Sequence, residues 1–122
     1  MAHMKHTPKS YAQAVEALAG RDSVKLGNNT RLERHFCGIA VRLHSTNIVM
    51  FHEDGRVALF TGGYYSVTTK SRMNQFIAGR VFQHAHQWYY DYPLVQVEGR
   101  GINTQRVREL FTEGMNVAQE VL

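Results

Sequence analysis

The chain has 122 residues, one cysteine and a formal net charge of +4, with 14 Lys or Arg against 10 Asp or Glu. This length suffices for a domain that buries its own core without metal or disulfide staples. Cys37 alone excludes an intramolecular disulfide. The chain shows neither a secretory leader nor an apolar run of about 20 residues, so we expect a cytoplasmic protein that does not enter a membrane.

The domain organisation follows from the same features. Residues 10–122 are expected to form a single domain. Residues 1–9 are expected to be a flexible N-terminus that begins with a vector remnant, because Met4 reads as the natural start.

The first two elements are predicted from local signals. Ser10 precedes an apolar stripe that Gly20 closes, which predicts a helix over residues 10–19. Residues 22–36 form two strand-like pieces around Gly27-Asn28-Asn29, where left-handed conformations are tolerated, so a hairpin is expected. Basic residues dominate its outward side: Lys25, Arg31 and Arg34.

Residues 38–67 predict an antiparallel meander. Asp54-Gly55 and Gly62-Gly63 separate alternating apolar segments, and such pairs are strong signals for two-residue hairpin loops. In the resulting register Met50 faces Leu59 and Phe60 faces Tyr65, and a weaker turn at Ser45-Thr46 sets Val41 opposite Met50. The predicted core face then holds Ile39, Val41, Leu43, Ile48, Met50, Val57 and Leu59.

In an antiparallel sheet with one solvent-exposed face, that face normally carries polar residues. The second face of this meander is instead apolar. It would collect Val49, Phe51, Ala58, Phe60, Tyr65 and Val67, edged by Arg42 and His44. Three explanations stay open: a curved sheet covered by the same chain, a face that self-associates into a homo-oligomer, or an aromatic platform on which bases stack.

A short helix is expected at about residues 69–78. Thr68 and Thr69 offer N-caps, and Lys70 and Arg72 lie in the first turn, where the helix dipole disfavours cations. Hydroxyls, free N–H groups and two cations would converge there, which makes Thr69, Lys70 and Arg72 a candidate anion site.

Residues 81–92 read as one long aromatic strand. Trp88 and Tyr90, together with Tyr64 and Tyr65, are candidates for a partner surface, because Trp and Tyr dominate interface hot spots. His84 and His86 share a face, but a metal site needs a third ligand, so no metal or other cofactor is predicted. A short edge strand at residues 94–97 and a last helix over 104–121 complete the expected elements.

No catalytic signature is present, and the sequence favours a protein that is not an enzyme. A metal-independent nuclease, which needs a base, an acid and a cation, remains an alternative that would use His35, His44 and His52 with Arg42. The predicted ladder places His44 and His52 at far ends of the sheet, which argues against their cooperation.

Several motifs occur together in one known group of proteins. These are the runs Ile39-Ala-Val-Arg-Leu-His44-Ser-Thr46, Gly62-Gly63 and Val67-Thr-Thr-Lys70-Ser-Arg72-Met-Asn74, preceded by Leu26-Gly-Asn-Asn-Thr30. Over about residues 10–78 the chain resembles a family of small proteins encoded by bacteriophages and prophages. The resemblance implies a viral accessory protein acting in the bacterial cytoplasm, and it transfers no catalytic or binding residue.

The expected fold is therefore α+β, an antiparallel meander of about five to seven strands with two to three helices packed around it. Two function classes stay open. The first is a phage accessory protein that binds nucleic acid through a basic surface: Lys25, Arg31, Arg34, Arg42, Thr69, Lys70 and Arg72. The second is a protein-binding module that inhibits or redirects a host enzyme through the aromatic residues.

Overall fold

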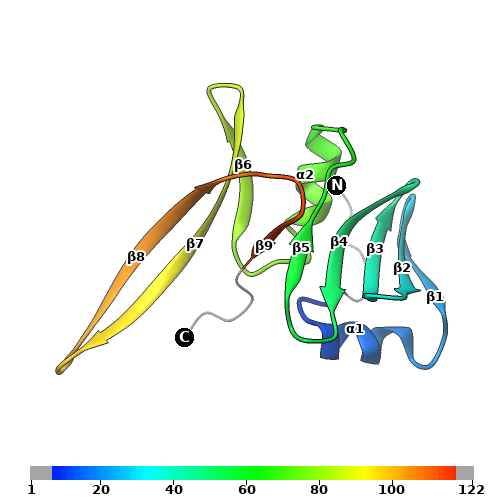
Figure 1. The fold of residues 1–122 in the computed structure, drawn as a ribbon, viewed down its shortest axis with the longest axis horizontal. Coiled ribbons are helices and arrows are strands. Elements are labelled where there is room, and N and C mark those ends of the chain that lie inside the picture. Colours follow the sequence, from blue (N-terminus) through cyan, green and yellow to red (C-terminus); the bar gives the residue numbers. More distant parts are fainter. Residues whose placement is uncertain (1–6, 118–122) are drawn as a thin grey trace.

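The computed structural model describes residues 7–117, which form an α+β protein with two antiparallel sheets and two helices (Figure 1). The elements are, in chain order, α1 (Tyr11–Leu18), β1 (Ser23–Gly27), β2 (Thr30–His35), β3 (Gly38–Leu43), β4 (Thr46–His52), β5 (Val57–Leu59), α2 (Val67–Met73), β6 (Arg80–His84), β7 (Gln87–Glu98), β8 (Gly101–Leu110) and β9 (Met115–Val117). The expectations for residues 1–6 and for the end of the last helix lie outside the described residues. Neither α1 nor α2 has the length and apolar character needed to cross a membrane.

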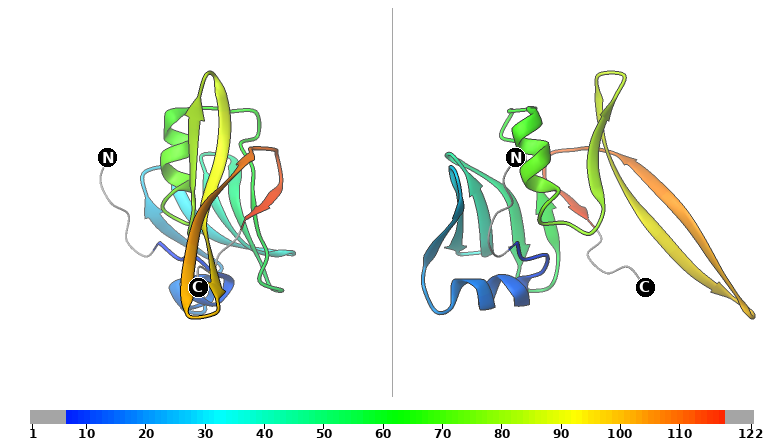
Figure 2. Two further views of the ribbon diagram at one scale, coloured as in Figure 1. Left: turned by 90° about the vertical axis from the view of Figure 1, so that its left-hand side faces the viewer. Right: turned by 180° about the vertical axis from the view of Figure 1, so that it is seen from behind.

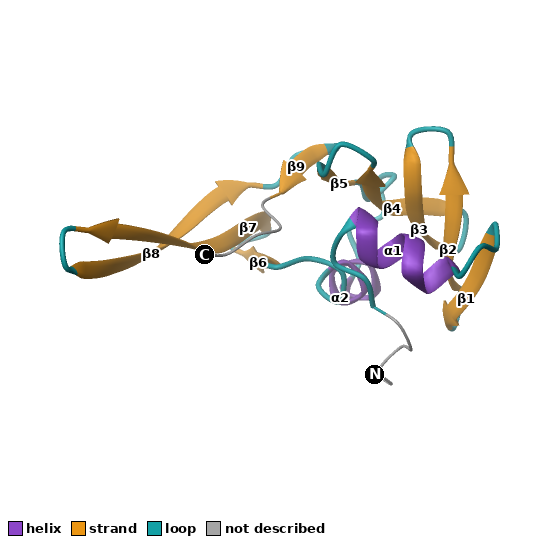
Figure 3. Ribbon diagram, turned by 90° about the horizontal axis from the view of Figure 1, so that it is seen from below, coloured by secondary structure: helices purple, strands orange, loops and turns teal. Residues whose placement is uncertain are grey.

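The larger sheet has six strands in the order β1-β2-β3-β4-β5-β9, and it is open rather than closed into a barrel. The predicted meander is therefore present from β1 to β5. Helix α1 lies against one face of this sheet (Figure 3). Ser10 caps α1 by accepting a hydrogen bond from the N–H of Gln13, and the hairpin predicted around Gly27 is formed by β1 and β2.

The predicted register of the meander is wrong by one residue. The loop between β4 and β5 has three residues rather than two, because the N–H of His52 bonds to the carbonyl of Arg56 and Gly55 takes a left-handed φ of 97°. Such a three-residue loop with a left-handed glycine is a common hairpin form. A one-residue slip moves side chains to the other face, so Met50 leaves the core, while Phe51 and Phe60 face opposite sides of the sheet.

The segment after Gly62-Gly63 is not the strand that the sequence predicted. The chain leaves the sheet there and enters α2, whose N-cap is Ser66 rather than Thr68 or Thr69. The place beside β5 is taken instead by β9. The carboxylate of Glu113 holds this returning chain, because it accepts hydrogen bonds from the N–H of Thr61 at 2.9 Å, from the Thr61 hydroxyl and from the N–H of Gly62.

The second sheet has three strands in the order β6-β7-β8. The short edge strand expected at residues 94–97 is the end of the continuous strand β7 (Gln87–Glu98) rather than a separate strand. Two further predictions are wrong here. The run expected as one strand is broken by a turn at Ala85 and His86, and the expected last helix over 104–121 is replaced, as far as residue 117, by β8 and β9. Strand β8 pairs with β7 in an unbroken register from Tyr89↔Leu110 to Glu98↔Gly101. This hairpin projects away from the rest of the molecule (Figures 1 and 2).

The core lies between the inner face of the six-stranded sheet, the two helices and the root of the second sheet. It contains six of the predicted core residues, Met50 being the exception. It also contains Val49 and Phe51 of β4 and residues of the helices, the second sheet and the loops that pack on this face: Ala14, Leu18, Met73, Phe76, Trp88, Tyr90 and Phe111. The opposite side of the sheet, here called the outer face, carries a small second cluster of Ala40, Met50 and Ala58.

Candidate functional site

Three of the predicted nucleic-acid-binding residues come together on the outer face. Lys25 in β1 is directly opposite Arg31 in β2, and Arg31 is directly opposite Arg42 in β3. We call Lys25, Arg31 and Arg42 the cation row. Because neighbouring strands lie about 4.8 Å apart, the row places three positive charges side by side across three strands.

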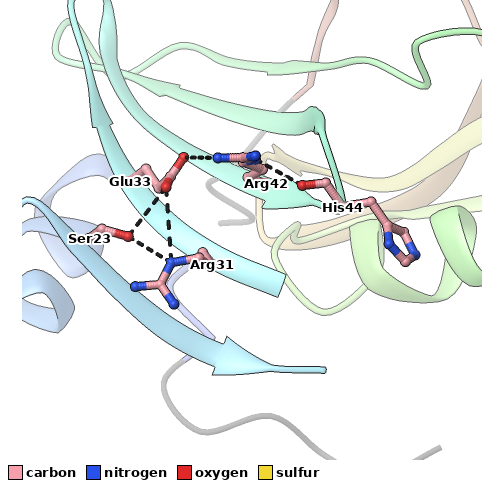
Figure 4. A network of polar contacts seen from close by, with 5 residues as sticks. All are labelled: Ser23, Arg31, Glu33, Arg42 and His44. Atoms are coloured by element: carbon pink, nitrogen blue, oxygen red, sulfur yellow. Dashed lines mark hydrogen bonds and ion pairs between the residues drawn. The ribbon is translucent and has the colours of Figure 1, made fainter. Parts of the chain in front are cut away.

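A single carboxylate partly compensates the cation row (Figure 4). Glu33 lies on the same face of β2, 4.0 Å from Nε of Arg31 and 3.4 Å from Nη1 of Arg42. Ser23 bridges the network, since its hydroxyl accepts a hydrogen bond from Nε of Arg31 and donates one to Glu33. Nε of Arg42 also donates to the carbonyl of His44 at 2.8 Å. These contacts fix the orientation of the Arg31 and Arg42 guanidinium groups.

Strand geometry explains why the sequence builds this row. Alternate residues of β1 and β2 point to opposite faces, so Val24, Leu26 and Leu32 enter the core while Lys25 and Arg31 face outward. A bulge between β3 and β4 then sets Arg42 opposite Asn47. Sequence reasoning missed Asn47 as a fourth polar member of the line, because no local signal marks the bulge.

The remaining predicted cations do not join the row. Arg34 points to the other side of β2 and forms an ion pair with Asp22 at 3.6 Å. Lys70 reaches toward the second sheet, with Nζ 5.4 Å from the centre of the Trp88 ring. Arg72 is buried, and its Nη2 donates to the carbonyl of Asn28 at 3.5 Å.

The predicted anion site at the start of α2 is therefore dispersed. Thr69 is buried, and its hydroxyl contacts that of Ser66 at 3.0 Å. A hollow of about 420 Å³ does lie beside this end of the helix. It is lined by Leu43, Ile48, His44, Ser45, Thr46, Thr61, Tyr64, Ser66, Thr68 and Thr69, so neither Lys70 nor Arg72 reaches it.

The four aromatic residues predicted as a partner surface divide into two pairs. Trp88 and Tyr90 are buried in the core, where the Trp88 ring packs edge-on against Phe111 with the centroids 5.5 Å apart. Tyr64 and Tyr65 are exposed, at 67% and 55% of their surface. Only the tyrosine pair is accessible to a partner.

The five histidines within residues 7–117 do not assemble into a catalytic group. His44 is in the turn between β3 and β4, whereas His52 ends β4 at the opposite end of the strands, and His35 ends β2 near His52. His84 is the last residue of β6, and His86 is in the turn that follows. Among the side chains that the structure describes, no three His, Cys, Asp or Glu residues gather as a metal site.

The fold and the site define a small α+β protein with an open, basic sheet face and a projecting two-stranded hairpin. The chain belongs to the Kyanoviridae Gp96 family, whose family model, described as Kyanoviridae Gp96 protein, matches residues 7–118. This membership confirms the predicted phage-encoded family. No curated protein and no solved structure matches the chain.

Proposed function

We propose that this phage protein is an accessory protein that binds nucleic acid through the cation row. One observation supports the proposal above all. Arg31 lies directly opposite Lys25 on one side and Arg42 on the other. Like charges in such cross-strand positions destabilise a sheet. An anionic ligand along the row would remove this repulsion.

The expected mode of binding is contact with the phosphate backbone. Arg and Lys contacts to phosphates provide most of the sequence-independent affinity of nucleic-acid-binding proteins. Glu33 neutralises part of the charge of Arg31 and Arg42, whereas no ion pair of Lys25 is present among the side chains that the structure describes. Phe60 packs against the cluster of Ala40, Met50 and Ala58 on the same face and offers an apolar surface there.

The test is fluorescence anisotropy with a labelled oligonucleotide across a salt series. Replacing Lys25 and Arg31 together by Gln should weaken binding at low salt and flatten the salt slope by up to about two units, one for each lost phosphate contact. The melting temperature should change little, because removal of the like-charge cross-strand pair offsets the loss of the exposed contacts of Arg31 with Ser23 and Glu33.

The matched control replaces Arg56 and Arg100 by Gln. Both side chains are exposed and lie away from the row, in the loop before β5 and in the turn after β7. This variant loses the same net charge and should keep the wild-type slope. Equal slopes for the row variant and the wild type, or no binding by the wild type, would refute the proposal.

A second candidate function, a protein-binding module that inhibits or redirects a host enzyme, is favoured by a different surface. Tyr64, Tyr65 and Val67 are consecutive or nearly so, and each exposes more than half of its surface. Capture of a bacterial protein by the wild type but not by Tyr64→Ser, unchanged by nuclease and insensitive to salt, would favour this candidate over nucleic-acid binding.

A further inference from the structure

Strands β7 and β8 continue past the end of the second sheet as a two-stranded arm, residues 92–107. Strand β6 pairs with β7 only as far as Asp91, so the arm has no third strand among the described residues. It extends from the body into open space (Figures 1 and 2). Near its tip Val97 and Ile102 form a cross-strand pair and expose 76% and 73% of their surface.

An arm of this kind is incomplete as a free structure. A two-stranded hairpin is marginally stable in water, and three or more strands are normally needed for independent stability. The root of the arm is well fixed, because the buried carboxylate of Asp91 pairs with Arg106 at 2.5 Å and with Arg80 at 3.6 Å. Beyond the root, the arm depends on its own ladder.

The open edges of the two sheets are protected unequally. Strand β1 carries Lys25 and a bulge, β9 has three residues, and β7 carries Pro93 just past the end of β6. Charged residues, bulges, shortness and proline are the usual protections of an edge strand. Strand β6 has five residues and begins with Arg80. Strand β8 has ten residues with neither proline nor bulge, and its charged residues, Arg106, Arg108 and Glu109, lie in its C-terminal half. Among the described residues β8 therefore presents the longest open edge for pairing.

The direction of the hydrogen bonds shows which β8 residues face outward. The N–H of Phe111 donates to the carbonyl of Trp88 at 3.0 Å, and in an antiparallel pair such bonded positions alternate. Odd-numbered residues of β8 therefore bond to β7, and even-numbered residues direct their N–H and C=O groups away from it. The missing N–H of Pro93, opposite Arg106, agrees with this pattern.

We propose that β8 pairs antiparallel with β8 of a second copy of this chain, about a two-fold axis at Gln105. The charges of the strand select this register. Three arginines lie on the strand or in the turn before it: Arg100, Arg106 and Arg108. With the axis at any of five other positions, an arginine would face an arginine of the second copy: Asn103, Thr104, Arg106, Val107 or Arg108. With the axis at Gln105, Arg106 faces Thr104 of the second copy, and Arg108 faces Ile102 of the second copy.

This pairing completes the arm. The two hairpins become a continuous four-stranded ribbon, in which four outward-facing residues of each β8 exchange hydrogen bonds with the other: Ile102, Thr104, Arg106 and Arg108. The tip of each arm lies beside the root of the other, where Leu110 is exposed. An interface related by a two-fold axis is also the commonest kind in soluble oligomers.

The experiment is sedimentation velocity on the full chain over a wide range of protein concentration, with substitutions at Thr104. Wild type should form a dimer in a concentration-dependent way. Thr104→Glu should tighten the dimer roughly 2- to 30-fold, because each Glu faces Arg106 of the other copy, and Thr104→Lys should weaken it by a similar factor.

A second pair of variants separates pairing from folding. Thr104→Pro removes an N–H that faces the second copy and none that bonds to β7, so it should abolish the dimer without changing the circular dichroism of the monomer. Thr104→Val keeps that N–H and should keep the dimer. A wild type that is monomeric at every concentration, or Glu and Lys variants with the same dimer dissociation constant, would overturn the proposal, whatever the outcome of the nucleic-acid assay.

Discussion

Tyr90 shows at the scale of one residue how packing in the second sheet changes a side chain. It is fully buried, and its ring stacks on that of Tyr92 with the centroids 5.5 Å apart. Its hydroxyl lies against the backbone of Gly79, where an added Cβ would come within 2.6 Å of it. Burial disfavours the charged phenolate and raises the pKa of Tyr90 to about 12, against a hydrogen bond from Gly79 that lowers it.

This pKa predicts a loss of stability in strong alkali. The unfolded chain releases the Tyr90 proton near pH 10 and the folded chain near pH 12, so the free energy of unfolding falls as the pH rises between those values, by roughly 2 to 3 kcal/mol. Below pH 10 the contribution is fully present. Urea denaturation at several alkaline pH values should show this fall in the wild type.

Tyr90→Phe is the control for the alkaline loss. The variant lacks the titrating hydroxyl, so its stability should decrease less steeply than that of the wild type over the same pH range. Parallel curves for the two proteins would show that Tyr90 does not titrate as its burial implies.

At the scale of secondary-structure elements, local signals predicted well where no distant strand competed. The N-cap at Ser10 correctly predicted α1, and the residues around Gly27 correctly predicted the hairpin of β1 and β2. The prediction of a last helix was wrong because ten residues of β8 pair with β7, and this pairing overrides the weak helical pattern. The turn at Ala85 and His86 could not be predicted from the sequence, since both residues adopt a positive φ that is normally signalled by glycine or asparagine.

The candidate site was predictable to a similar degree. Alternation along β1 and β2 was enough to place Lys25 and Arg31 on the same outward side. Arg42 joins them only through the pairing of β2 with β3, and the neighbour of Arg42 in β4 depends on a bulge. Arg72 looked accessible in the sequence but is buried by contacts between α2 and the first hairpin.

Glu113 is the contact that fixes β9 beside β5, and its removal should therefore be costly. Glu113→Ala leaves the N–H of the buried Thr61 without its acceptor, and an unsatisfied buried donor costs about 1 to 3 kcal/mol. Chemical denaturation should show a loss of that size. Glu53→Ala, on the exposed loop after β4, should change stability by less than about 0.5 kcal/mol; an equal loss in both variants would contradict the role of Glu113.

At the scale of the whole molecule, the two proposed binding surfaces lie on separate parts of the fold. The cation row is on the outer face of the six-stranded sheet, and the open edge of β8 is on the projecting arm. Pairing of two arms would join two bodies, each with its own cation row, in one particle. Two linked sites bind a long polymer more tightly than either alone, so the two proposals reinforce each other without depending on each other.

The most direct measurement of the central claim is a residue-by-residue map of nucleic-acid contact. Amide chemical shifts of the isotope-labelled protein, recorded while a short single-stranded oligonucleotide is added at low salt, should change most at Lys25, Arg31 and Arg42 and at their neighbours in β1 to β3. The changes should reverse as salt is raised, because they report phosphate contacts. Changes centred on Tyr64 and Tyr65, or none at all, would contradict the account.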